Sequence, residues 1–115
     1  MRTQEIRTLN FNLGVQKQKQ YTMKGMSQAQ ANGKDYVNGI VEEWLANFQF
    51  VTIKKQIGFL KEELRFAKTT IKEIKEDIET YKDNKEYLQE FNEDLEKWTM
   101  VQTILTDMLS VMVGA

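Results

Sequence analysis

The sequence of 115 residues contains no cysteine, no histidine and no proline. Without cysteine, the chain cannot form a disulfide framework, a thiolate zinc site or a cysteine nucleophile. Without histidine, it lacks the commonest general base and the commonest ligand of transition metals. The absence of proline suits long uninterrupted helices. Because these absences exclude most familiar hydrolase sites, we expect a protein that is not an enzyme and that uses no metal or cofactor.

The chain also lacks an apolar run long enough to span a bilayer. Its most apolar segment, residues 100–115, is short and contains Asp107. Residues 1–5 lead into a polar segment without the apolar core of a secretory signal. We therefore expect a soluble cytoplasmic protein with no membrane partner.

Charge is distributed unevenly, although the net charge is only −1. Residues 1–35 hold six basic and two acidic side chains, a net charge of +4. The rest of the chain holds 10 basic and 15 acidic side chains, a net charge of −5. A basic arm on an acidic body is typical of a chain with two parts of different role. We divide the chain into a basic N-terminal arm, residues 1–34, and a helical domain, residues 35–115.

Two apolar stripes with alternating spacings of three and four residues dominate the helical domain. Such spacing keeps a narrow seam turned toward one partner helix. The first stripe comprises Ile53, Ile57, Leu60, Leu64, Ala67, Ile71, Ile74, Ile78 and Tyr81. The second comprises Leu88, Phe91, Leu95, Trp98, Gln102, Leu105, Leu109 and Met112, with one polar member. Between the stripes, Asp83 and Asn84 are candidate helix N-caps. The pattern predicts an all-α fold built on a long antiparallel αα-hairpin, with helices over about residues 53–81 and 84–113.

A third packing helix is predicted over about residues 35–48, where apolar residues cover one broad face. Asp35 is its expected N-cap, and Gly39 inside it suggests close packing. The apolar phase breaks between residues 47 and 52, so we expect a turn there and a cap at Thr52. Both hairpin helices widen their apolar faces at the end away from the turn, which predicts a three-helix base with a two-helix arm projecting from it.

The N-terminal arm shows a strand-like alternation. Leu9, Phe11, Leu13 and Val15 share one side if the chain is extended, and a second, weaker candidate strand surrounds Tyr21 and Met23. This alternation favours short β-strands in the N-terminal extension. The alternatives of helix and coil stay open at this point.

Two groups of carboxylates are candidate sites of chemistry. Glu86, Glu90 and Asp94 fall on one helix face, where carboxylates four residues apart can hold a divalent cation if other oxygens converge. A solvated acidic face is the favoured interpretation. Glu42 and Glu43 are adjacent in sequence, so they diverge on a helix and cannot face one substrate together. Gln102 is the one polar residue expected in the seam, where it would either fix the register or oligomer state or lie at the edge near the third helix.

Excess apolar surface near the C-terminus predicts self-association. From residue 99 to residue 115 the only charged residue is Asp107. Apolar side chains off the seam widen this face beyond what one short helix covers, and soluble monomers seldom leave such a patch exposed. We expect a dimer or higher oligomer whose interface includes Met100, Ile104, Met108 and Val111.

The leading interpretation is therefore a non-enzymatic helical protein that acts as a homo-oligomeric assembly or as a protein–protein interaction module. The alternative is a nucleic-acid-binding protein that uses the basic arm, where cations would contact phosphates and the interleaved aromatics would stack on bases. The residues expected to contact nucleic acid are Arg2, Arg7, Lys17, Lys19 and Lys24. The composition, rich in Lys, Glu, Asn and Ile, resembles that of accessory proteins from phages and mobile elements. The sequence does not name the partner or the stoichiometry.

Overall fold

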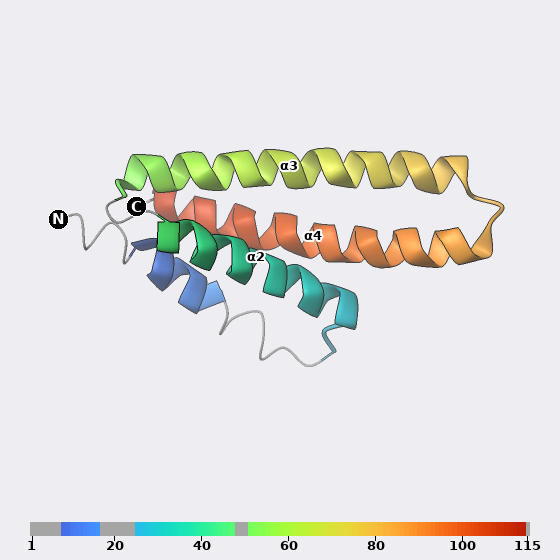
Figure 1. Ribbon diagram of the computed structural model, residues 1–115, viewed down its shortest axis with the longest axis horizontal. Coiled ribbons are helices and arrows are strands. Elements are labelled where there is room, and N and C mark those ends of the chain that lie inside the picture. Colours follow the sequence, from blue (N-terminus) through green and yellow to red (C-terminus); the bar gives the residue numbers. More distant parts are fainter. Residues whose placement is uncertain (1–7, 17–24, 48–50, 115) are drawn as a thin grey trace.

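The computed structural model describes residues 8–16, 25–47 and 51–114. Within these ranges the secondary structure is helical, with no strand. Residues 8–16 form one helical segment, and three longer helices follow: α2 (Gln28–Asn47), α3 (Ile53–Thr80) and α4 (Lys85–Gly114). The expected all-α fold and its antiparallel hairpin are confirmed, since α3 and α4 lie side by side and are joined by one tight turn (Figure 1).

Caps place the ends of the hairpin helices close to their predicted positions. The Thr52 side chain accepts a hydrogen bond from the Lys55 backbone N–H at 3.1 Å, so α3 begins at Ile53 as expected. At the turn, Asn84 rather than Asp83 is the N-cap of α4, because its Oδ1 accepts from the Tyr87 backbone N–H at 3.1 Å. Each cap satisfies one of the backbone donors that a helix start leaves without a partner.

The third helix begins seven residues earlier than predicted, at Gln28 instead of Asp35. Ser27 and Gln30 form a reciprocal capping box, in which the Gln30 N–H donates to Ser27 Oγ and the Ser27 N–H donates to Gln30 Oε1, each at 3.0 Å. Asp35 is therefore an exposed residue inside the helix and not its cap. The helix continues through Gly33, which is buried against α4, so this glycine does not end it.

Gly33, not Gly39, is the glycine that permits close packing. A Cβ on Gly33 would clash with the Lys97 carbonyl oxygen and lie 3.1 Å from the Met100 Cβ, whereas a Cβ on Gly39 would meet nothing. The backbone of α2 therefore comes against the backbone of α4 at Gly33.

Residues 8–16 form a helix, so the strand predicted there is wrong. Leu9 and Leu13 are four residues apart and buried on one helix face, whereas Phe11, which a strand would place beside them, is 69% exposed. Burial of Asn12 and Gln16 follows the same helical spacing. The period-two alternation was misleading because a nine-residue segment also offers an i, i+4 pair. The second candidate strand, near Tyr21 and Met23, lies outside the described residues.

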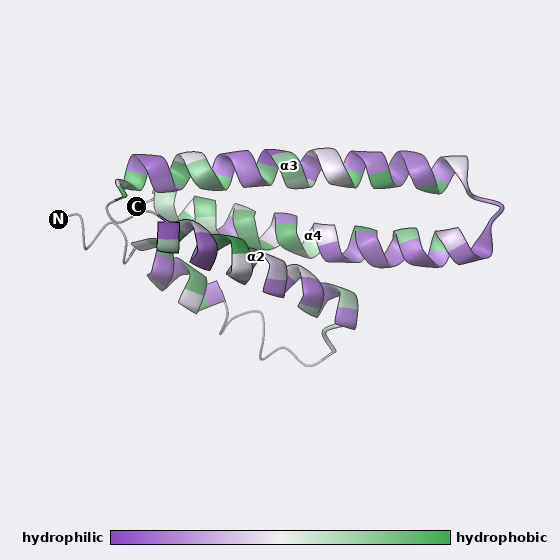
Figure 2. Ribbon diagram, in the orientation of Figure 1, coloured by the Kyte–Doolittle hydropathy of each residue, from purple (hydrophilic) through white to green (hydrophobic). Residues whose placement is uncertain are grey.

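The core sits where α2, the hairpin and the segment 8–16 meet. Its fully buried hydrophobic members are Leu9, Val37, Val41, Leu60, Ala67, Val101, Ile104, Leu105 and Met108. Figure 2 shows hydrophobic residues gathered at this end of the hairpin and a largely hydrophilic far end. The predicted packing of a third helix on the base of the hairpin and the projecting two-helix arm are confirmed, and the segment 8–16 adds a further helix to the base (Figure 1). Gln102 is only partly buried, and Gln56 is the fully buried polar side chain of α3.

Candidate interaction site

An aromatic cluster forms where the hairpin turns. Tyr81 follows the last residue of α3 and Tyr87 lies in the first turn of α4, so the turn brings their rings to a centroid distance of 5.3 Å in a T-shaped arrangement. Phe91, one helical turn further along α4, lies 5.8 Å from the Tyr81 ring and 6.1 Å from the Tyr87 ring. We call Tyr81, Tyr87 and Phe91 the tip cluster. Edge-to-face and tilted contacts at such distances are favourable for aromatic rings.

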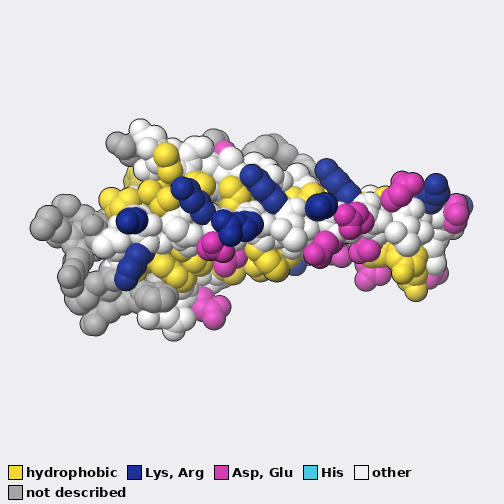
Figure 3. All heavy atoms as spheres, turned by 90° about the horizontal axis from the view of Figure 1, so that it is seen from above, with side chains coloured by type: hydrophobic (Ala, Val, Ile, Leu, Met, Phe, Trp, Pro, Cys, Tyr) yellow, Lys and Arg dark blue, Asp and Glu magenta, His cyan; other side chains and the backbone are white. Residues whose placement is uncertain are grey.

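The tip cluster is exposed because α2 does not reach it. The N-terminal end of α2 contacts α4 near Glu96 and Lys97, and α4 runs from there to the turn with α3 as its packing partner. Tyr81 and Tyr87 consequently remain 44% and 45% exposed, while Phe91 is partly buried beneath them. Figure 3 shows hydrophobic side chains at the surface close to this end of the molecule.

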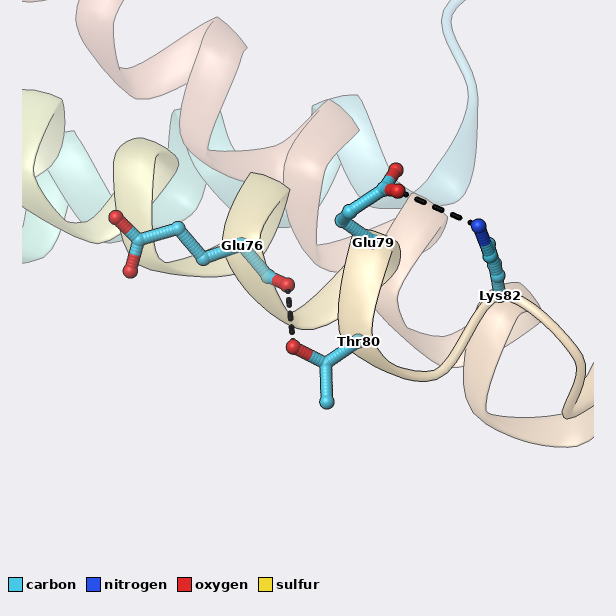
Figure 4. A network of polar contacts seen from close by, with 4 residues as sticks. All are labelled: Glu76, Glu79, Thr80 and Lys82. Carbon is cyan, nitrogen blue, oxygen red and sulfur yellow. Dashed lines mark hydrogen bonds and ion pairs between the residues drawn. The ribbon is translucent and has the colours of Figure 1, made fainter.

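A polar frame holds the last turn of α3 beside the tip cluster (Figure 4). Thr80 Oγ1 donates a hydrogen bond to the Glu76 carbonyl at 3.0 Å, and Lys82 Nζ lies 3.5 Å from Glu79 Oε1. The ion pair is highly exposed, so its contribution to stability is small. These polar groups pair with one another within the chain. The tyrosine rings are therefore the groups at the tip against which a partner would pack.

A second aromatic group lies where α2 meets the hairpin. The Trp98 ring is 4.9 Å from Tyr36 and 5.6 Å from Phe66, both edge-on, and Lys97 Nζ lies 5.4 Å from the centroid of the Trp98 ring. Partial burial raises the pKa of Glu63, and burial together with the nearby Glu63 charge raises the pKa of Tyr36. This group joins α2 to the hairpin; Tyr36 and Trp98 are partly buried, whereas Phe66 remains 54% exposed.

The carboxylates considered for chemistry do not form a metal site. Among the described residues there is no group of three or more His, Cys, Asp or Glu side chains placed to hold a metal ion. Glu86, Glu90 and Asp94 are all exposed on α4, and Glu42 and Glu43 are exposed on α2. The chemistry left to the candidate site is binding: the rings of the tip cluster can pack against a partner, and the tyrosine hydroxyl groups can form hydrogen bonds with it.

The four residues predicted for the oligomer interface are separated by the fold. Ile104 and Met108 are completely buried inside the single chain, so they have no surface to offer a second copy. They belong to the same hydrophobic cluster as Leu9 and Leu13 of the helical segment 8–16, so as interface residues they need correction. Met100 is partly buried against α2, and Val111 is 50% exposed. Interface roles for Met100 and Val111 stay predictions.

The basic residues proposed to contact nucleic acid, Arg2, Arg7, Lys17, Lys19 and Lys24, all lie outside the described residues. The heptad pattern does not predict the tip cluster, because it places Tyr81 in the seam and leaves Tyr87 outside it. The signal that could have revealed it is the presence of aromatic residues on both sides of a short polar turn.

Within the described ranges, no helix is both long enough and apolar enough to cross a membrane. Comparisons of the chain with models of protein families, with curated proteins and with solved structures found no match.

Proposed function

We propose that this chain is a non-enzymatic protein-interaction module that engages another protein through the tip of its hairpin arm. The observation that carries the proposal is the pair of half-exposed tyrosines, Tyr81 and Tyr87, fixed against Phe91 at the end of a projecting two-helix arm. Tyrosine is enriched among the residues that dominate binding energy at protein interfaces, because it combines a large apolar surface with a polar tip.

Rigidity of the tip supports this proposal. The Asn84 cap, the Thr80 hydrogen bond and the three ring contacts hold the tyrosines in one arrangement before a partner arrives. A surface that is already ordered loses less side-chain entropy on binding than a flexible one. The arm also carries the tip away from the base, in a molecule whose longest dimension is 55 Å against 28 and 26 Å (Figure 1).

The test is capture and cross-linking with the full chain. A photoreactive residue placed at Glu90, which is exposed three residues after Tyr87 on the same side of α4, should cross-link to the partner in a host lysate. Tyr81→Ala together with Tyr87→Ala should lower the yield of that cross-linked product about tenfold or more, since hot-spot truncations cost roughly 2 kcal/mol or more. The matched control, Phe66→Ala, removes a similarly exposed aromatic ring away from the tip and should leave the yield unchanged.

A yield that is equal in the wild type and the double tyrosine variant would contradict the proposal. A cross-link between two copies of this chain would instead identify the arm as a homo-oligomer interface. The chain would then be the homo-oligomeric assembly that the sequence also favours.

A further inference from the structure

A row of cations runs along one face of α3. Lys54, Lys61, Lys68 and Lys75 are spaced by seven residues, which is close to two helical turns. Arg65 and Lys72 are also seven residues apart and fall between these lysines, so all six side chains project from one side of the helix. The row comprises Lys54, Lys61, Arg65, Lys68, Lys72 and Lys75, and every one of them is exposed. It extends about 31 Å along the axis at ~1.5 Å per residue. Figure 3, which views the molecule from the α3 side, shows dark blue side chains following one another along its length.

The acidic side chains near the row are few. Glu62 pairs with Arg65 at 3.4 Å, and Glu79, which continues the row toward the turn, pairs with Lys82. Glu76 flanks the row beside Lys72 and Lys75. The remaining acidic residues of α3 fall on other faces of the helix, since they are out of phase with the seven-residue step.

The neighbouring face of α4 carries no charge. Lys61 lines a shallow groove together with Thr106, Leu109 and Ser110, which places this face of α4 beside the row. The residues that continue it along α4 at steps of three and four are all uncharged: Asn92, Leu95, Thr99, Gln102, Thr106, Leu109 and Val113. Glu96 borders this face and accepts a hydrogen bond from Ser27 Oγ at the start of α2, at 2.5 Å. One side of the hairpin is therefore cationic on α3 and rich in hydroxyl and amide groups on α4.

We propose that this side of the hairpin binds the phosphate backbone of a nucleic-acid duplex without sequence preference. Lysine and arginine supply the charge that phosphates require, and hydroxyl and amide groups such as those of Thr99, Gln102 and Thr106 donate hydrogen bonds to phosphate oxygens. A straight row on one rigid helix matches a rigid duplex. Charges are screened over about 10 Å at 0.1 M salt, so the local row outweighs the net charge of −1.

Two other classes of partner fit this face less well. The contact surface of a protein partner is enriched in aromatic residues and depleted in lysine, the reverse of this row. A single strand needs exposed aromatic platforms for its bases. Of the exposed aromatics, Phe66 packs edge-on against Trp98 and Tyr81 and Tyr87 lie at the tip, so none of these three stands in the row.

The test is fluorescence anisotropy of a labelled DNA duplex of about 24 base pairs with the full chain. Binding at about 50 mM salt should weaken about 10³-fold by about 200 mM if all six cations contact phosphates. The triple substitution Lys61→Glu, Lys68→Glu and Lys75→Glu should abolish binding at the higher salt. Replacing the same three lysines by Gln should lower the slope of log K against log salt by about 3. The matched control changes charge equally away from the row, with Lys55→Glu, Lys82→Glu and Lys85→Glu, and should retain most of the affinity.

Circular dichroism should report unchanged helicity for the row variants and the matched control, because every lysine that they replace is exposed. The proposal is overturned if the wild type does not bind the duplex at low salt. It is also overturned if the row variants bind like the wild type while Lys17→Glu with Lys19→Glu abolishes binding, or if only vesicles containing phosphatidylserine bind. The tip variant Tyr81→Ala with Tyr87→Ala should bind DNA normally, so this result is independent of the protein-binding function proposed above.

Discussion

Gly33 shows how much one missing side chain contributes to this fold. Since a Cβ at this position would overlap the Lys97 carbonyl oxygen, any other residue forces α2 away from α4. Gly33→Ala should therefore lower the free energy of unfolding by about 1–3 kcal/mol, as overpacked sites do. Urea denaturation followed by circular dichroism measures this loss.

Gly39→Ala is the matched control, because it lies in the same helix with open space around its Cα. It should be neutral or stabilise the protein by up to about 1 kcal/mol through better helix propensity. Equal destabilisation by the two substitutions would show that the close contact of α2 with α4 at Gly33 is wrong.

Glu63 makes the stability of the protein depend on pH. Burial raises the pKa of its carboxyl above the ordinary value of 4.5, so the folded chain binds a proton more tightly than the unfolded chain. Stability that is present below the unfolded pKa is then lost as the pH rises through the folded pKa. The melting temperature of the wild type, measured relative to Glu63→Gln, should fall as the pH is raised from about 4 to about 7.

Glu62→Gln is the control for this measurement, since it removes the same charge from a highly exposed neighbouring position. A difference between wild type and Glu63→Gln that is independent of pH would disprove the assignment.

At the scale of elements, the segment 8–16 differs most from its sequence-based expectation. The helix buries Leu13 and exposes Phe11, whereas a strand would place both side chains on the same face. Leu13→Asp should lower the free energy of unfolding by about 2–4 kcal/mol, because it places a charge among buried hydrophobic residues. Phe11→Asp should change it by no more than about 0.5 kcal/mol. Similar losses from both substitutions would favour the strand.

The hairpin helices, in contrast, could be predicted almost to the residue. The two stripes have nine and eight positions, and Thr52 and Asn84 lie directly before the first helical turns. A long repeat averages out local exceptions such as Gln102. The segment 8–16 is too short for its apolar pattern to distinguish the period of two residues of a strand from the period of 3.6 residues of a helix.

At the scale of the whole molecule, the apolar surface left exposed at the C-terminal end of α4 favours association of more than one chain. The fold covers Ile104 and Met108 but leaves Val111 half exposed and Val113 61% exposed at the C-terminal end of α4. We expect light scattering to report more than one chain at micromolar concentration, and Val111→Asp to lower the measured mass. Met108→Asp should instead reduce helicity and melting temperature, since its side chain lies in the core.

Thr103→Asp, at an exposed position of the same helix, should leave the mass unchanged. A wild type that remains a single chain at high micromolar concentration would reject self-association and leave the tip cluster for a different protein.

The sequence by itself determined the elements whose cause is local or repetitive. These are the hairpin helices, their caps, the turn between them, and the need for a third helix at the base, because heptad spacing and capping side chains act within a few residues. Tertiary structure alone decided where α2 approaches α4, which face of the segment 8–16 is buried, and that Ile104 and Met108 are covered. It also decided that the tip aromatics stay exposed and that one side of the hairpin is cationic. These features depend on which helices lie next to one another, and residues far apart in the chain set that arrangement together.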